Sequence, residues 1–252
     1  GFLYGWGLFE TMRSYNHRIA YFNQHLQRIK NSCKLIKMQF PYSIDKLKEI
    51  IIKAVKLSGQ RDAYVRLTLW KSNKGTETLV IARKYQPHSL KKYMQGFRAS
   101  IYSFRKNEDS FFPKIKTTSY LFYRIAYLEA KNRGFDEAII LNNRGYISEG
   151  SRSNIFLVKD NQIFTPALEC GCLDGITRKA IFDLAKKYNL KIEEGKFSLL
   201  DLHRADEAFL TNSLMGVMPL VSIEKQLIGK GSAGRITKFL IQKYNILLKN
   251  GT

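Results

Sequence analysis

The sequence predicts an α/β protein of two domains, an α+β N-terminal lobe followed by a mixed α/β C-terminal lobe. Three observations carry this prediction. The first hundred residues order β-like runs and helical segments so that strands can pair with their neighbours. A polar, turn-rich stretch at residues 105–113 has the composition of an interdomain linker, and helices and strands alternate again after it. We place the N-terminal domain at residues 1–107, the linker at 108–115 and the C-terminal domain at 116–252.

The N-terminal lobe opens with two β-like runs, 9–15 and 18–22, joined at Asn16-His17, a polar pair that tolerates a tight turn. Ser43 is suited to cap the second helix of this lobe and Gly59 to end it. The other predicted elements are helices at 23–38 and 43–59 and strands at 63–71, 78–83 and 97–104. The chain begins with Gly1, already inside a strand-like run, so we expect an initial segment to be absent from it.

The C-terminal lobe is predicted from the same periodicities. Its helices are expected at residues 119–133, 177–188 and 233–248, with a short one from Ser198. Its strands are expected at 137–142, 154–159, 162–165, 191–197 and 207–211. We find no internal repeat and no low-complexity tract.

Charge narrows the choice of partners. The chain has 42 Lys and Arg against 21 Asp and Glu, a net charge of +21 that would attract nucleic acid, acidic membranes or anionic metabolites. The lysines interleave with apolar residues along segments such as 43–59, as they do on solvated helix faces. No helix-turn-helix, zinc-finger or RNA-binding aromatic motif is present. We therefore expect an anionic substrate and cofactor rather than nucleic acid.

Cysteine usage and hydropathy indicate a soluble, cytoplasmic protein without a metal. No stretch approaches the roughly 20 apolar residues of a membrane helix, so no membrane role is expected. Three cysteines are an odd number for a disulfide framework, and reduced thiols are expected. Cys170 and Cys172 form a C-x-C pair without a histidine or second pair at zinc spacing, so no metal site is predicted.

Several segments place chemically capable residues together, although each has an ordinary interpretation alone. Lys114 and Lys116 precede a helix, where lysines are usually solvated. Residues 145–154 could be only a polar hairpin, and residues 170–178 only a capped helix start.

Taken together, these segments resemble the class IV aminotransferases, the fold type IV pyridoxal-phosphate (PLP) enzymes that include D-amino-acid aminotransferases, over nearly the whole chain. The resemblance rests on residues 7–13 (GLFETMR), 25–28 (HLQR), Lys116 with Ser119 and Tyr120, 149–156 (EGSRSNIF), 175–178 (GITR) and 211–219 (TNSLMGVMP). One departure is Gly5-Trp6-Gly7, where the family often has Gly-Asp-Gly, so the role of that acid is missing or replaced by Trp6.

The resemblance implies a catalytic lysine and a carboxylate. Lys116 would form the Schiff base with PLP and then act as acid and base, which requires an amine able to lose its proton near neutral pH. Lys114 is the competing candidate, but a lysine, three residues and an aromatic at the start of a helix fit Lys116 and Tyr120. Glu149 matches the carboxylate that keeps the pyridine nitrogen protonated.

The resemblance also implies a phosphate site. The dianion needs free amides at a helix N-terminus together with a cation, because both offset its charge. Ile176 and Thr177 would supply the first and Arg28 the second. Asn212 and Ser213 would complete the phosphate site. Tyr120 would hydrogen-bond to the ring hydroxyl of PLP, unless it is only a packed helix tyrosine.

The substrate contacts leave two activities open. Residues 211–216 and 9–13, with Phe9 and Met215, resemble aminodeoxychorismate lyases, which release pyruvate and the folate precursor 4-aminobenzoate. Tyr64 and Arg66 resemble the carboxylate-binding pair of branched-chain aminotransferases, although Arg66 could equally be a salt-bridged strand residue. We favour the lyase over an aminotransferase of branched-chain or D-amino acids that uses 2-oxoglutarate. The resemblance further implies a homodimer.

Overall fold

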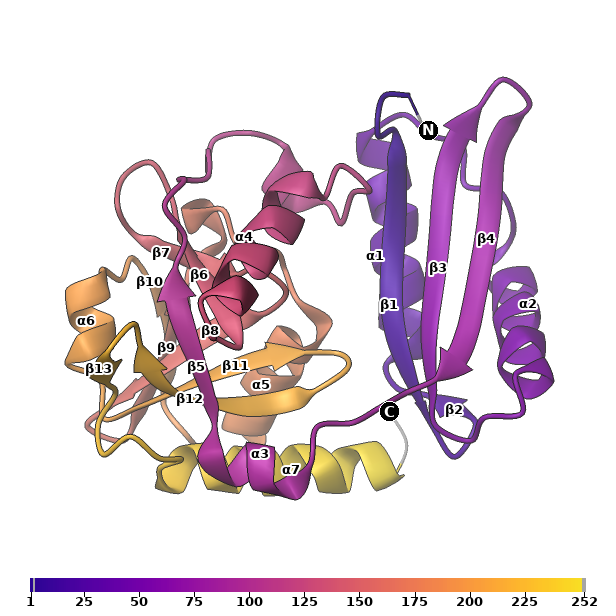
Figure 1. Cartoon of the computed structure of the whole chain (residues 1–252). Coiled ribbons are helices and arrows are strands. Elements are labelled where there is room, and N and C mark those ends of the chain that lie inside the picture. The colour runs from indigo at the N-terminus through magenta and orange to yellow at the C-terminus, as the bar shows by residue number, and fades with distance from the viewer. Residues whose placement is uncertain (2, 251–252) are drawn as a thin grey trace. The chain divides into compact units, whose positions relative to one another are not determined.

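The computed structural model describes residues 1 and 3–250, and it divides the chain into two compact units (Figure 1). The first unit comprises Gly1–Pro87, Lys114–Tyr120 and Leu247–Thr252, and the second comprises His88–Pro113 and Leu121–Ile246. The predicted two-domain class, with an α+β first lobe and a mixed α/β second lobe, is confirmed. The boundary differs from the expected one near residue 107, because the first unit ends at Pro87 and later regains a short segment.

The first unit is built on an antiparallel sheet with strand order β2-β1-β3-β4. Its strands are β1 (Gly7–Tyr15), β2 (Arg18–Ile19), β3 (Ala63–Ser72) and β4 (Gly75–Lys84). Asn16 and His17 both have positive φ, 48° and 67°, as the tight hairpin turn between β1 and β2 requires. The predicted hairpin is therefore confirmed.

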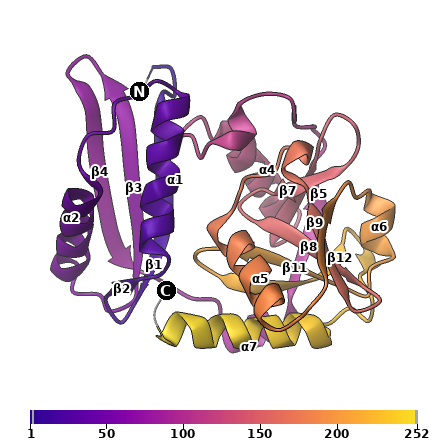
Figure 2. The ribbon, with the colours of Figure 1, turned by 180° about the vertical axis from the view of Figure 1, so that it is seen from behind.

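Two helices, α1 (Phe22–Leu35) and α2 (Ile44–Leu57), cover one face of this sheet, as the opposite views of Figures 1 and 2 show. The strict alternation along β3 explains the arrangement, because Val65, Leu67 and Leu69 are buried toward the helices. Tyr64 and Arg66 fall on the other face. The side chain of Ser43 accepts a hydrogen bond from Lys46 N and caps α2, as predicted.

The segment Lys114–Tyr120 returns to the first unit and lines the edge of β1. Phe9 N donates to Lys116 O over 2.9 Å, Thr118 N donates to Gly7 O over 2.9 Å, and Leu8 and Thr117 form an antiparallel bridge. This pairing fixes the backbone of Lys116 against Phe9.

The second unit contains a mixed sheet with strand order β10-β9-β8-β11-β12-β5-β6-β7, with β13 paired to β12. The strands are β5 (Phe97–Ile101), β6 (Glu137–Leu141), β7 (Ile147–Gly150), β8 (Asn154–Lys159), β9 (Gln162–Pro166), β10 (Ile192–Gly195), β11 (Glu207–Asn212), β12 (Gly216–Ile223) and β13 (Gln226–Leu227). The central strands β6, β8 and β12 are buried almost throughout, as strands with both faces covered are.

Helices cover this second sheet. They are α3 (Leu90–Gln95), α4 (Leu121–Asn132), α5 (Ile176–Lys187), α6 (Leu199–His203) and α7 (Arg235–Asn250), with short 3-10 turns at Phe112–Lys114 and Leu168–Cys170. α4 packs on β6, and α5 packs on β11. Glu207 on β11 accepts hydrogen bonds from the N–H groups of Ile236 and Thr237, so it holds the first turn of α7 to the sheet.

Two predictions about the elements need correction. The strand expected at 97–104 in the first lobe is β5, which pairs in parallel with β12 and β6 of the second sheet. The stretch 145–154, expected to be a turn, contains the buried strand β7. The first error arises because the partners of β5 lie far away in sequence, which local patterns do not show. β7 pairs with the preceding strand β6, and it was missed because its residues Ser148 and Glu149 are polar although buried.

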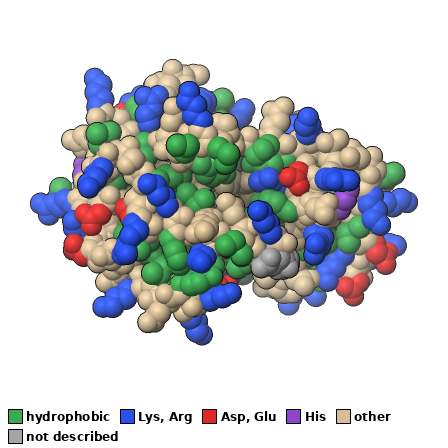
Figure 3. Space-filling view, turned by 90° about the horizontal axis from the view of Figure 1, so that it is seen from below, with side chains coloured by type: hydrophobic (Ala, Val, Ile, Leu, Met, Phe, Trp, Pro, Cys, Tyr) green, Lys and Arg blue, Asp and Glu red, His purple; other side chains and the backbone are tan. Residues whose placement is uncertain are grey.

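Basic side chains are interspersed with polar and apolar ones over the face drawn in Figure 3, in keeping with solvated lysines rather than one basic patch. Within residues 1 and 3–250, no helix has both the length and the apolar composition needed to cross a bilayer. The same described residues include no group of three or more His, Cys, Asp and Glu side chains placed to hold a metal ion.

Candidate active site

In the first unit, Lys116 lies against two aromatic rings. Its Nζ is 4.7 Å from the ring centroid of Phe9 and 5.9 Å from that of Tyr120. The two rings meet edge to face with centroids 5.4 Å apart. Phe9 is only 4% exposed, so this wall is fixed by packing. The structure therefore brings together three of the predicted site residues.

Arg66 reaches the same ring from β3. Its Cζ lies 3.8 Å from the Phe9 ring centroid, and its Nε donates a long 3.4 Å hydrogen bond to Thr68. Tyr64, two residues earlier on the same face of β3, stacks under Arg83 at 4.7 Å. Within residues 1 and 3–250, Arg66 makes no ion pair with a carboxylate, and its guanidinium lies on this aromatic ring.

Arg28 is held in the first unit by a buried carboxylate. Its Nε and Nη2 donate to the two oxygens of Glu10, each over 2.7 Å, and His25 Nδ1 lies 2.7 Å from Glu10 Oε2. Burial would raise the pKa of Glu10, but the charges of Arg28 and His25 overcome this and lower it to about 2. Burial lowers the pKa of His25, which Glu10 only partly offsets. The network fixes the orientation of Arg28.

In the second unit, Glu149 on β7 is 5% exposed and well supplied with donors. Tyr123 Oη donates to its Oε1 over 2.9 Å, and the backbone N–H of Leu173 donates to its Oε2 over 3.0 Å. Lys106 Nζ forms an ion pair with Oε1. The carboxylate is therefore surrounded by donors and rigidly placed.

Ile176 and Thr177 occupy the first turn of α5, and both are buried. The N-cap position is Gly175, which has no side chain to cap the helix, so the first amides are available to an anion. A Cβ at Gly175 would lie 2.0 Å from Asn154 Oδ1, so the turn has no room for a side chain. Thr177 Oγ1 lies 3.5 Å from Tyr244 Oη.

The loop after β11 is shaped by Asn212. Its Oδ1 accepts hydrogen bonds from Leu214 N (3.0 Å) and Met215 N (2.9 Å), and its Nδ2 donates to Arg152 O. In this structure its side chain therefore organises the turn that carries Ser213. Met215 is 7% exposed and packs in the apolar core of the second unit, and its contact with substrate stays a prediction.

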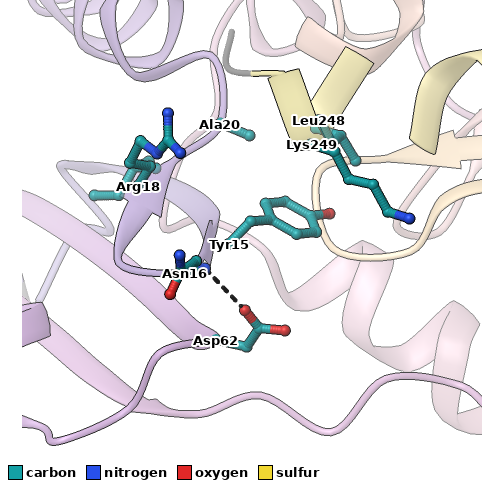
Figure 4. A pocket seen from close by; sticks show the side chains of 8 residues that line it. Tyr15, Asn16, Arg18, Ala20, Asp62, Leu248 and Lys249 are labelled. Carbon is teal, nitrogen blue, oxygen red and sulfur yellow. Dashed lines mark hydrogen bonds between the residues drawn. The ribbon is translucent and has the colours of Figure 1, made fainter. Parts of the chain in front are cut away.

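A cavity of about 310 Å³ lies elsewhere in the first unit, at the far end of β1 (Figure 4). It is lined by Tyr15, Asn16, Arg18, Ile19, Ala20, Asp62, Leu248 and Lys249. Tyr15 is six residues along β1 from Phe9, or about 20 Å at the rise of a strand. Burial raises the pKa of Tyr15 to about 12. None of the predicted site residues lines this cavity.

The sequence model of the family described as amino-transferase class IV matches residues 7–223. The chain belongs to the class IV aminotransferase family. The predicted resemblance is thereby confirmed, and the family model spans every segment on which the resemblance rested.

Similar proteins carry two kinds of name. A branched-chain-amino-acid aminotransferase of Pseudomonas aeruginosa is 30% identical over 265 residues, covering 99% of this chain and 86% of that protein. An aminodeoxychorismate lyase of Bacillus subtilis is 34% identical over 264 residues, covering 99% and 88%. The Escherichia coli branched-chain amino acid aminotransferase superposes with a TM-score of 0.93 at 28% identity, covering 99% of this chain and 88% of that one.

A further solved relative carries the cofactor. This branched-chain amino acid aminotransferase, from an organism abbreviated T.th., was solved with pyridoxamine 5'-phosphate and superposes with a TM-score of 0.93 at 29% identity. The match covers 100% of this chain and 88% of that one. The same enzyme has been solved with N-(5'-phosphopyridoxyl)-L-glutamate. The fold of this chain is therefore one that accommodates a phosphopyridoxyl group in a relative.

The residues of this class IV aminotransferase family member fit a PLP group. Thr211 Oγ1, beside Asn212, is buried and has no hydrogen-bond partner among the described residues. With the side-chain-free N-cap at Gly175, it is an unused polar group of the kind that a phosphate satisfies. In the first unit, Arg28 and Lys116 have the chemistry to bind an anion and an aldehyde, and in the second unit Thr177 offers a hydroxyl for an anion. The prediction of a PLP enzyme is confirmed at the level of the family.

Sequence reasoning missed the residues that support the site. Glu10 belongs to the quoted segment 7–13 but received no role, and Lys106 was counted among linker residues. The signal for Glu10 is a carboxylate in the middle of a strand, between Leu8 and Met12 on the side that faces the helices. No local signal marks Lys106, because its partner Glu149 lies 43 positions away in sequence.

Proposed function

We propose that this protein is a PLP-dependent aminotransferase of branched-chain or D-amino acids that uses 2-oxoglutarate as acceptor. The similar proteins are mostly named branched-chain-amino-acid aminotransferases, and this favours the aminotransferase over the lyase that the sequence motifs suggested. The phosphopyridoxyl-glutamate bound to one of these aminotransferases supports glutamate and 2-oxoglutarate as one substrate pair.

One observation carries the proposal. Lys116 and Arg66 both contact the ring of Phe9, at 4.7 Å and 3.8 Å from its centroid. An amino acid needs a base near its Cα and a cation for its carboxylate, and the planar guanidinium of arginine binds carboxylates in a bidentate manner. We therefore assign the substrate carboxylate to Arg66 and Tyr64, with Phe9 as the apolar wall between the charged groups.

Lys116 is proposed to carry the catalytic proton. When bound, PLP supplies an aldehyde for the substrate amine and a ring that accepts electrons. Lys116 Nζ would take the proton from the substrate Cα, hold it, and release it to the carbon that carried the aldehyde. Tyr120, packed on Phe9, is proposed to donate to the ring hydroxyl and to limit the movement of the lysine.

Anion binding is assigned to two sets of groups. The amides of Ile176 and Thr177, the Thr177 hydroxyl and the loop of Asn212 and Ser213 are proposed to bind the phosphate, because they combine a helix N-terminus with small polar side chains. Arg28 is proposed to add the cation, since Glu10 fixes its orientation. Glu149 is proposed to meet the pyridine nitrogen.

Aminodeoxychorismate lyase activity is the second candidate. The Bacillus subtilis lyase is 34% identical across 99% of this chain, which is higher than the identity to the Pseudomonas aeruginosa aminotransferase. Both reactions begin with removal of the α-proton by the lysine, and they differ in whether a β-substituent then leaves. A carboxylate on the substrate would suit Arg66 in either case.

Product identity separates the two candidates. Purified protein loaded with PLP is given branched-chain L-amino acids or D-amino acids with 2-oxoglutarate, and glutamate is measured. In parallel it is given aminodeoxychorismate, and 4-aminobenzoate and pyruvate are measured. Glutamate formation that depends on Lys116 supports the aminotransferase, and 4-aminobenzoate without glutamate would replace it with the lyase. A homodimer, checked by sedimentation, remains a prediction from the family, and a cytoplasmic location remains a prediction from the composition.

A further inference from the structure

Lys106 is a buried lysine whose ammonium is committed to a single carboxylate. The residue is 7% exposed, and its Nζ pairs with Glu149 Oε1 and lies 5.0 Å from the ring centroid of Tyr123. Burying an ammonium is costly unless it is paired and hydrogen-bonded, so this placement costs stability that a surface lysine would not. A chain with 42 basic residues has no need of a buried one for charge alone.

The backbone fixes Lys106 as firmly as its side chain. Its N–H donates to Leu141 O over 2.9 Å, its carbonyl accepts from Asn143 N over 3.1 Å, and it forms a parallel bridge with Asn142. Lys106 therefore continues the pairing of β5 with β6 beyond the ends of both strands. The side chain of Lys106 therefore extends from a fixed backbone position, and this gives the ion pair with Glu149 a defined geometry.

The donors around Glu149 are unevenly divided between its oxygens. Lys106 and Tyr123 both act on Oε1, whereas Oε2 receives only the N–H of Leu173 among the described residues. A carboxylate has about four lone-pair sites, so Oε2 keeps capacity for one further donor. The ammonium on Oε1 also cancels part of the negative potential at Oε2, because charges interact strongly in a buried site.

We infer that Lys106 is a positioning residue that tunes the proton on the cofactor's ring nitrogen by sharing the charge of Glu149. The inference rests on the proposed function, in which Glu149 meets that nitrogen. The ammonium of Lys106 holds the Glu149 carboxylate in place and weakens its attraction for the proton on the ring nitrogen. Without it, the same carboxylate would face the ring nitrogen with its full charge and with less restraint.

Other titratable groups near this pair do not substitute for Lys106. Burial raises the pKa of the Cys172 thiol to about 12, with Glu149 adding to the rise, so the thiol is neutral across the usable pH range. The Arg178 side chain is also close to Cys172, but it pairs with Glu194 and donates to Pro166 O over 3.2 Å. Burial also raises the pKa of Cys170. Tyr123 donates a neutral hydroxyl.

The test follows the ring nitrogen directly. Wild-type protein and Lys106→Met are loaded with PLP carrying ¹⁵N in the ring, and the ¹⁵N shift is measured against pH. Loss of the ammonium should move the midpoint of ring deprotonation about one pH unit higher, because a like charge beside Glu149 disfavours the protonated ring and its removal leaves the carboxylate unopposed. Lys106→Arg keeps the charge and should stay close to wild type.

Two controls guard against indirect effects. Lys159→Met removes an exposed lysine that pairs with Asp206 over 3.0 Å in the same unit, and it should leave the ¹⁵N titration unchanged.

If Lys106→Met is too unstable to load, urea unfolding of the apoprotein is compared for Lys106→Met, Glu149→Gln and the double variant. If the double variant has a higher urea midpoint than Lys106→Met, the two charges stabilise each other. If the losses in unfolding free energy of the two single variants simply add, the proposed pairing is overturned.

The outcomes separate this inference from the proposed function. Wild-type protein that binds PLP while Lys106→Met gives the same ¹⁵N titration would overturn the role of Lys106 and leave the proposed function standing. Wild-type protein that takes up no PLP would remove the proposed function, and the role of Lys106 with it.

Discussion

Glu10 and Arg28 are joined by two hydrogen bonds of 2.7 Å, one from Nε to Oε1 and one from Nη2 to Oε2. The carboxylate is fully buried, whereas the arginine side chain is 15% exposed. The guanidinium of Arg28 is therefore held in a fixed orientation by Glu10 while its side chain stays partly exposed. We interpret this pair as the support on which the proposed phosphate binding by Arg28 would depend.

Glu10→Gln should weaken both the fold and the cofactor site. Removing one charge of a buried pair leaves the other uncompensated, and we expect a loss of roughly 3 kcal/mol in the free energy of unfolding. The dissociation constant for PLP should also rise, because Arg28 loses its orientation. Urea unfolding and fluorescence titration with PLP measure the two effects. Glu49→Gln, which breaks an exposed pair with Lys46, is the control and should change neither.

The same network predicts loss of stability in acid. Glu10 has a pKa of about 2 in the folded protein against 4.5 as its ordinary value, and the pKa of His25 is lowered from 6.5. Both groups bind protons more readily when unfolded, so their stabilisation is present above their ordinary pKa values and is lost as pH falls. Stability should decline first below about pH 6.5 and further between pH 4.5 and 2. A Glu10→Gln variant that showed the same decline below pH 4.5 would contradict this account.

Lys116→Ala should abolish the covalent link to PLP. The chain offers a matched control two residues away, because Lys114 lies exposed in the same segment. Borohydride reduction of PLP-treated protein, followed by peptide mass analysis, should find the cofactor on Lys116 in wild type and in Lys114→Ala. If Lys116→Ala kept its turnover and the reduced cofactor were found on one other lysine, that lysine would be the catalytic one.

Arg66→Lys should affect substrate binding more than cofactor binding. The ammonium keeps the charge but loses the planar fork and its stack on Phe9, so we expect KM for the amino acid to rise about tenfold. The absorption of bound PLP should stay as in wild type. An unchanged KM would show that Arg66 serves only the packing of the sheet.

Gly175→Ala should disturb the start of α5. The new Cβ would meet Asn154 Oδ1, whose amide also donates to Leu173 O over 2.7 Å. We expect weaker binding of PLP and of inorganic phosphate, measured by calorimetry, because the first turn must shift. Adding Asn154→Ala removes the clash, so the double variant should recover part of the affinity if crowding is the cause. No recovery would show that the contact with Asn154 is not the cause.

Local patterns predicted more of the helices than of the sheet. The predicted helices at 23–38, 43–59 and 177–188 agree with α1, α2 and α5 to within a few residues, because capping and apolar periodicity are local. β5 was placed in the wrong lobe, because its partners β6 and β12 come after it along the chain and its own residues do not distinguish two sheets. Strand pairing depends on distant residues.

The candidate site was also predicted only in part from the sequence. Lys116, Glu149 and Thr177 stand in motifs that the family resemblance located, and their roles remain proposals. Lys106 could not have been found from its surroundings, since a lysine in a polar stretch ordinarily faces water. Only the fold shows that it is buried beside Glu149.

The first unit is not a continuous stretch of chain, since Lys114–Tyr120 lies hydrogen-bonded along Gly7 and Phe9. A fragment that ends at residue 107 would therefore lack the segment Lys114–Tyr120, which pairs with the edge of β1. The amides and carbonyls at the start of β1 would then form a bare sheet margin, which readily recruits strands from other molecules. Attempts to express that lobe alone should yield self-associating material unless the seven missing residues are grafted back through a turn.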